Sequence, residues 1–122
     1  EDLADTWRLD PFDFEWTRFS ETTLDSGDTI PSKRSAHAAV GLPDEMLVFG
    51  GKLGDEVLYG DLLRFSPASG LWTDLSARMT GDSPAARAHH AMAYQDGFVY
   101  LTGGTGLNGG VRLGTGEIYI LD

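Results

Sequence analysis

The sequence predicts an all-β protein built from a repeated unit of four short antiparallel strands. Three observations lead to this prediction. The 16 glycines are spread along the 122 residues rather than clustered, which is typical of a chain with many tight turns. No stretch shows the apolar spacing that an amphipathic helix requires. Segments of the chain also match one another at a separation of roughly 50 residues, which indicates a repeated structural unit.

The repeat becomes visible when the sequence is aligned with itself at two separations. A shift of 53 residues places Arg34 on Arg87, His37 on His90, and the pair Gly50-Gly51 on Gly103-Gly104. A shift of 56 residues aligns a second set of positions, namely Asp61 with Glu117, Trp16 with Trp72, Leu63 with Tyr119 and Pro11 with Pro67. The two shifts differ because the loop after Gly104 is three residues longer than the loop after Gly51. Length changes confined to loops are what a repeated fold tolerates.

The aligned copies divide the chain into one complete unit and two partial ones. Residues 1–19 supply the third and fourth strands of one unit, at 5–10 and 15–19. Residues 34–75 supply a complete unit, with strands at 34–40, 46–50, 61–66 and 71–75. Residues 87–122 supply the first three strands of the next unit, at 87–94, 98–103 and 117–122. Turn residues such as Pro43-Asp44 and Pro67 separate the strands of the complete unit.

Charge and composition restrict the possible partners. The formal net charge is −10 and the Lys and Arg residues are scattered, so binding to nucleic acid or to an anionic membrane surface is disfavoured. Apolar runs are far too short for a transmembrane span, so membrane insertion is not expected. The chain has no cysteine, which excludes disulfides and thiolate metal sites and favours a reducing compartment such as the cytoplasm.

The repeated unit resembles the kelch repeat over nearly the whole chain. The matching features are Arg34-x-x-His37, the run Met46–Gly51, the acidic-aromatic segment that starts at Asp61, and Trp72 after a proline turn. The resemblance implies a β-propeller, in which four-stranded blades pack face to face around a central channel. The sequence then covers about two and a quarter blades, and we expect further blades of the same chain to complete a ring.

The recurrence of the motif residues favours structural roles for them. Arginines at one repeat position are expected to anchor strands, paired glycines to allow unusual backbone angles, and tryptophans to pack between blades. The residues concerned are Arg34, Arg87, His37, His90, Gly50, Gly51, Gly103, Gly104, Asp61, Trp16 and Trp72. A metal site formed by His37, His89 and His90 is the alternative, but residues at one repeat position lie in different blades. No metal and no cofactor are therefore expected.

Two classes of function fit the repeat. The first is a scaffold that binds a protein partner through its loops, as the resemblance implies. The second is part of a carbohydrate-active enzyme, an oxidase or a sugar epimerase or mutarotase, whose catalytic residues lie in other blades. The sequence favours the scaffold, because no catalytic cluster of acidic residues and histidines is visible.

The two ends of the predicted propeller differ in their connections. The turns from strand one to two and from three to four carry acidic residues without Lys or Arg: Asp13, Asp44, Glu45 and Asp96. The opposite end has the long loops, at 18–33, 52–60, 76–86 and 105–115, with both signs of charge. Long loops on a rigid scaffold are where recognition usually occurs. The candidate binding residues are therefore Lys52, Asp55, Glu56, Tyr59, Arg78, Asp82, Asn108 and Arg112, with Tyr59 and Arg112 preferred because these residue types are common at binding hot spots.

Overall fold

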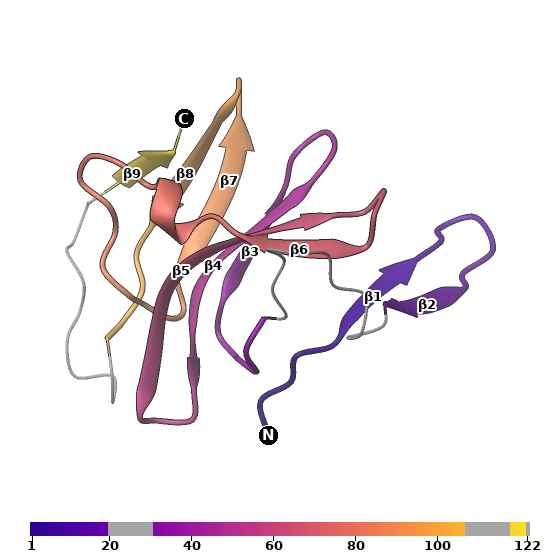
Figure 1. Ribbon diagram of the computed structural model, residues 1–122, viewed down its shortest axis with the longest axis horizontal. Coiled ribbons are helices and arrows are strands. Elements are labelled where there is room, and N and C mark those ends of the chain that lie inside the picture. The colour runs from indigo at the N-terminus through magenta and orange to yellow at the C-terminus, as the bar shows by residue number, and fades with distance from the viewer. Residues whose placement is uncertain (20–30, 107–117, 122) are drawn as a thin grey trace.

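The computed structural model describes residues 1–19, 31–106 and 118–121, and it folds into three antiparallel sheets in chain order (Figure 1). The first sheet pairs β1 (Thr6–Leu9) with β2 (Trp16–Phe19). The central sheet has the order β3 (Ala38–Gly41), β4 (Met46–Leu53), β5 (Val57–Ser66) and β6 (Leu71–Asp74). The third sheet contains β7 (Ala91–Gln95), β8 (Phe98–Thr102) and β9 (Ile118–Leu121). These sheets are called the first, central and third blade below.

Turn chemistry explains where the strands reverse. Asp96 and Gly97 join β7 to β8 as a two-residue hairpin, and both have a positive φ, of 52° and 87°. A hairpin of this type needs left-handed backbone at both central positions, which the sequence Asp-Gly supplies. After β6 the chain forms a short 3₁₀ helix, η1 (Ser76–Arg78), and crosses to the third blade. Within the described residues, no helix is long and apolar enough to cross a membrane.

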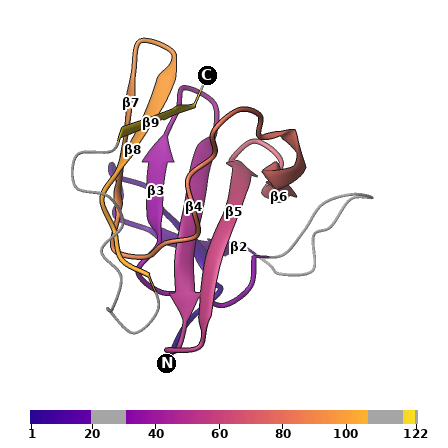
Figure 2. The same cartoon turned by 90° about the vertical axis from the view of Figure 1, so that its left-hand side faces the viewer.

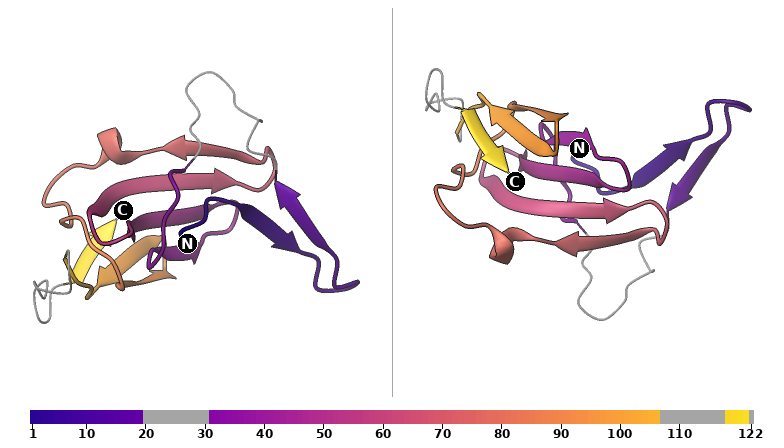
Figure 3. Two further views of the ribbon diagram at one scale, coloured as in Figure 1. Left: turned by 90° about the horizontal axis from the view of Figure 1, so that it is seen from below. Right: turned by 90° about the horizontal axis from the view of Figure 1, so that it is seen from above.

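The hydrophobic core lies between the central and third blades. Alternate residues of β4 and β5, namely Leu47, Phe49 and Leu62, are at most 4% exposed and face Val99 and Leu101 of β8. Successive side chains of a strand point to opposite faces, so each strand of the central blade contributes to two interfaces. Figure 2 and Figure 3 show the central blade between the other two, and Figure 3 shows the first blade extending away from it.

The opposite face of the central blade packs against the first blade. The ring of Phe65 on β5 meets the ring of Phe19 on β2 edge to face, with 5.0 Å between ring centroids. Trp72 lies opposite Phe65 on β6, and their centroids are 5.1 Å apart. Aromatic pairs in such geometry stabilise an interface by about 0.5–1.5 kcal/mol beyond the area they bury.

Backbone hydrogen bonds also join the blades, and one of them recurs with the repeat. The amide of Arg34 donates to the carbonyl of Leu3 at 3.0 Å, and the amide of Arg87 donates to the carbonyl of Tyr59 at 3.1 Å. Leu3 and Tyr59 occupy the same repeat position. A further bond runs from the amide of Gly51 to the carbonyl of Arg87, at 2.8 Å. The blades are therefore held in register by the main chain as well as by apolar packing.

The structure differs from the sequence-based expectation in two places. The first strands of the central and third blades begin at Ala38 and Ala91, four residues later than expected, because the residues before them form only isolated bridges. The bridge of Arg34 with Leu3 joins two blades, whereas those of Ser35 with Lys52 and of Ala88 with Thr105 lie within a blade. The expected loop at 52–60 is wrong, because β4 continues to Leu53 and β5 starts at Val57. Pairing resumes beyond a register shift between Phe49 and Gly51, and the result is a long hairpin.

Candidate interaction surface

The side chain of Arg34 joins several segments of the central blade by hydrogen bonds. Its guanidinium donates to the carbonyl of Gly50 at 2.9 Å and to both carboxylate oxygens of Asp61, at 2.7 and 2.9 Å. A fourth bond reaches the carbonyl of Ser32 at 3.2 Å, and the guanidinium lies 4.3 Å from the ring centroid of Tyr59. The planar fork of arginine suits this bidentate and stacked arrangement. Arg34 therefore ties three separate segments together.

Arg87 occupies the same repeat position in the third blade and makes matching contacts. Its side chain is 1% exposed and donates to the carbonyl of Gly103 at 2.8 Å and to the carbonyl of Ala85 at 3.0 Å. The residue that corresponds to Asp61 in this blade is Glu117, which lies outside the described residues. Two contacts are shared: each side chain donates to the carbonyl of the first glycine of its pair and to the carbonyl two residues before the arginine.

The paired glycines adopt backbone conformations that other residues rarely take. Gly50 and Gly51 have φ of 70° and 103°, and Gly103 and Gly104 have φ of 76° and 108°. A Cβ atom on Gly50 would stand 2.5 Å from the carbonyl oxygen of Arg87. Glycine is thus required at this position both for the backbone angle and for the close approach of the next blade.

The three histidines lie in different surroundings. His90 is buried with its ring 5.7 Å from that of Phe49, and neither of its ring nitrogens has a hydrogen-bond partner among the described residues. Burial lowers the pKa of His90, and the positive charge of Arg87 lowers it further. His37 is more exposed, and its pKa is lowered by partial burial and by Arg34. Among the described residues, no group of three or more potential ligands is placed to hold a metal ion.

Three of the predicted binding residues lie together near the tip of the β4–β5 hairpin. Asp55 and Glu56 are exposed, and Lys52 is half-buried with its Nζ 4.0 Å from Oδ1 of Asp55. The amide of Gly54 donates to Oδ2 of Asp2 at 2.6 Å, which lowers the pKa of that carboxyl group. The N-terminal segment therefore holds the hairpin tip, at the lower edge of Figure 1. Asp2 was not among the residues that the sequence singled out.

Tyr59 lies on β5 of the same hairpin, farther from its tip, and contacts Arg34 and Lys33. One face of its ring is covered by the Arg34 guanidinium, and its hydroxyl is 3.4 Å from the carbonyl of Lys33, to which it donates. The side chain is half-buried. Tyr59 thus joins the hairpin to the segment before β3 and presents only part of its surface to solvent.

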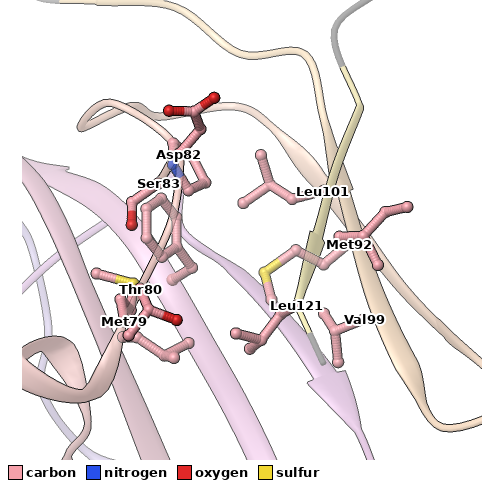
Figure 4. A pocket seen from close by; sticks show the side chains of 12 residues that line it. Met79, Thr80, Asp82, Ser83, Met92, Val99, Leu101 and Leu121 are labelled. Atoms are coloured by element: carbon pink, nitrogen blue, oxygen red, sulfur yellow. The ribbon is translucent and has the colours of Figure 1, made fainter.

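Two more predicted residues, Arg78 and Asp82, lie on the segment that leaves the central blade. Both are exposed, and each borders a hollow between the central and third blades. The hollow next to Asp82 has a volume of about 60 Å³, and Figure 4 shows Asp82 and Ser83 on one side of it with Leu101 on the other. The remaining predicted residues, Asn108 and Arg112, lie outside the described part of the chain.

The expectation of acidic turns without basic neighbours needs a correction. Nε of Arg64, near the end of β5, lies 3.7 Å from Oε2 of Glu45 in the β3–β4 turn, so one acidic residue at this end is paired. Sequence reasoning also missed Phe12 and Phe14, which project from the β1–β2 turn and are 92% and 76% exposed. The alignment at 56 residues could have drawn attention to this turn, because it places Phe14 at a position where the central blade has a glycine, Gly70.

A four-stranded antiparallel sheet lies between two partial sheets, and an arginine and a glycine pair recur at the same repeat positions. This arrangement is typical of β-propeller blades. The whole chain, residues 1–122, matches the family described as "KLHDC2/KLHL20/DRC7 Kelch-repeats domain". The chain belongs to this kelch-repeat family, and the predicted fold class is confirmed.

Curated relatives share the repeat but are far longer than this chain. The "Leucine-zipper-like transcriptional regulator 1 homolog" of Drosophila melanogaster is 36% identical over 74% of this chain and 8% of its own length. The "Multiple epidermal growth factor-like domains protein 8" of Homo sapiens is 33% identical over 70% of this chain and 3% of its own length. The similarity therefore concerns the repeat segment and not the activity of the whole relatives.

Proposed function

We propose that this segment is a protein-interaction scaffold that binds its partner through the β4–β5 hairpin and the neighbouring connections. Protein binding is the usual role of kelch-repeat domains. The proposal adds the end of the propeller that is used and the residues that make contact.

One observation carries the proposal: the exposed, charged tip of the β4–β5 hairpin is held in place by hydrogen bonds to other segments. Asp55 and Glu56 take no part in the core, whereas the base of their hairpin is fixed by Arg34 and its tip by Asp2. A surface that is ordered before binding loses little conformational entropy when a partner arrives. Both signs of charge are present, because Lys52 lies on the same hairpin.

Kelch-repeat domains are typically non-catalytic. The described residues contain no cluster that could hold a catalytic metal. His90, whose pKa is lowered by burial, is enclosed between blades rather than open to a substrate. We therefore propose binding and not catalysis as the role of this segment.

The test is a pair of charge-matched double variants in the full-length protein. Asp55→Ala with Glu56→Ala removes two acidic residues from the hairpin tip. Asp44→Ala with Asp96→Asn removes two from the opposite end, and asparagine tolerates the positive φ at position 96. We expect the first pair to weaken binding of the protein partner at least about tenfold. The melting temperature should stay within about 2 °C of that of the unmodified protein.

The control pair should leave partner affinity unchanged. The proposal fails if the control pair alone weakens binding, or if neither pair does. Tyr59→Ala is a poor first probe, because it also removes the surface on which Arg34 stacks. Arg112 and Asn108 stay predictions and can be tested by the same assay once the hairpin result is known.

A further inference from the structure

The β1–β2 turn displays two phenylalanines at the end of the propeller opposite the hairpin tip. Phe12 is 92% exposed, more than any other large apolar residue in the described part of the chain, and Phe14 is 76% exposed. The turn projects at the right-hand edge of Figure 1 and covers residues 10–15. Large apolar side chains in such a position need an explanation.

Hydrogen bonds fix the turn, so the phenylalanines are presented by an ordered loop. The amide of Asp10 donates to the carbonyl of Glu15 at 2.9 Å, and the amide of Phe14 donates to the carbonyl of Asp10 at 2.8 Å. The amide of Phe12 donates a hydrogen bond to Oδ1 of Asp10, and the amide of Glu15 donates one to Oδ1 of Asp13. Each donor–acceptor distance is 2.9 Å. Binding through this turn would therefore require little additional ordering.

The matching turn of the central blade shows that the fold requires neither phenylalanine. There the amide of Gly70 donates to the carbonyl of Ser66 at 2.8 Å, the same bond as that from Phe14 to Asp10. Gly70 has φ of 72° and Phe14 has φ of 61°, so phenylalanine stands in a left-handed conformation that suits glycine. The backbone of the turn therefore does not account for the phenylalanine at position 14.

A neighbouring blade would account for Phe14 but not for Phe12. A Cβ atom on Gly70 would lie 3.2 Å from the ring of Phe19 in the first blade, so the Phe14 position faces the preceding blade. Ala68 corresponds to Phe12 and is exposed although the first blade lies beside it. Phe12 is therefore expected to stay in solvent when a blade covers Phe14.

The charge of the turn indicates the kind of partner. Asp10, Asp13 and Glu15 are exposed around the two rings. The nearby guanidinium of Arg8 lies 5.9 Å from the ring centroid of Phe19, on the side of the central blade. We propose that Phe12 anchors a second protein partner, one with an apolar pocket bordered by Lys or Arg side chains. An anionic membrane is disfavoured, because the acidic residues would be repelled from it.

The experiment places the photo-crosslinking residue p-benzoylphenylalanine in the full-length protein, at position 12 in one variant and at the matched position 68 in another. We expect position 12 to crosslink a protein that position 68 does not. The crosslinked protein is then purified and its affinity for the unmodified full-length protein is measured. Affinity should fall at least about tenfold on Phe12→Ala and should weaken as salt is raised, because the partner's basic residues face an acidic turn.

Phe12→Ala restores the residue of the matched turn, so folding should be kept, and circular dichroism and thermal melting verify this. The proposal is overturned if position 12 crosslinks only within its own chain or to lipid, or if both positions capture the same proteins. It is also overturned if Phe12→Ala leaves affinity unchanged or if salt does not affect it. Unchanged binding in the variants of the hairpin tip would separate this partner from the one proposed above.

Discussion

Residues at the same repeat position lie in opposite surroundings in the central blade and in the two blades beside it. Leu62 on β5 is 4% exposed, whereas Ile118, its counterpart on β9, is 64% exposed. Leu63 is 2% exposed, and its counterpart Trp7 on β1 is 51% exposed. The side chains are similarly apolar, but β5 is paired with a strand on each side, whereas β1 and β9 are edge strands of their sheets. The central blade also differs in having a neighbouring blade on each face.

This comparison shows that a blade does not bury its own faces. Its sheet supplies two apolar surfaces, and each is shielded only when another blade packs on it, as expected for a repeat architecture. The first and third blades each have an uncovered apolar face. Trp16 on the first blade and Ile120 on the third are both 60% exposed. We expect further blades to cover both faces in a closed propeller.

The largest effect we expect comes from deleting the same apolar position in the two surroundings. In the 122-residue chain, Leu62→Ala should lower the free energy of unfolding by about 2–5 kcal/mol, because it leaves a cavity between the central and third blades. Ile118→Ala should cost less than about 1 kcal/mol, because the side chain is already in contact with water. Chemical denaturation of each variant measures both values.

A longer chain that includes the following blade sharpens the comparison. There the cost of Ile118→Ala should rise toward that of Leu62→Ala, since the next blade would bury the side chain. Equal costs for the two variants in the 122-residue chain would contradict the view that neighbouring blades control burial.

The motif arginines provide the opposite case, because they are buried in both blades. Arg34 is 7% exposed and Arg87 is 1% exposed. Lysine at either position keeps the charge but cannot reproduce the fork of hydrogen bonds, so each change should cost about 2 kcal/mol by chemical denaturation. Arg64→Lys is the control, because its contact with Glu45 is partly exposed and should contribute less than about 1 kcal/mol. A cost at Arg34 without one at Arg87 would show that the repeat positions are not equivalent.

The repeat explains why so much of the fold was predictable. The same spacing of Arg, Gly-Gly and Trp predicted an all-β fold of antiparallel blades, and this fold class is confirmed. The structure has sheets of two, four and three strands. The extension of β4 and β5 was missed because Gly51 and Gly60 indicate a loop, whereas pairing across the register shift depends on the partner strand. The Phe12 turn was missed because it was interpreted through its acidic residues alone.

The candidate binding surface was predictable only as a set of connections. The sequence predicted Lys52 and Asp55 in a connection, although Lys52 lies on β4. It does not show that Asp2 would bond to their hairpin or that Arg34 would cover Tyr59. These contacts join residues that are distant in sequence, so no local pattern predicts them. Which exposed residues touch a partner depends on the partner's shape as well.

A smaller effect, visible only on acidification, should separate His90 from its counterpart His37. The folded state lowers the pKa of His90 below the unfolded value of about 6.5, mainly through burial, so it favours the neutral ring. The associated stability is present above that value and is lost as pH falls toward the folded pKa. The loss is at most about 1.4 kcal/mol per pH unit for one proton.

His90→Asn should therefore flatten the dependence of the free energy of unfolding on pH between about 6.5 and 5. Arg87, His37 and His89 are the charged or titratable groups that act on His90, so they are kept unchanged in this variant. His37→Asn should flatten the curve less, because His37 is more exposed. An unchanged slope for His90→Asn would show that the acid sensitivity arises from other groups.

The smallest expected effect has the opposite sign, and it compares the first blade with the central blade at the turn. Phe14→Gly gives the first blade the residue that the central blade has at Gly70, and it relieves a positive φ of 61°. The relief of about 1–2 kcal/mol is offset by the greater freedom of glycine in the unfolded chain, so the variant should be about 0.5–1 kcal/mol more stable. Ala68→Phe in the matched turn is the control and should change stability little, because Ala68 is exposed and its backbone φ is not positive. A destabilised Phe14→Gly variant, measured by chemical denaturation, would show that the Phe14 ring packs within the fold, and Phe12 alone would then be the candidate contact at this turn.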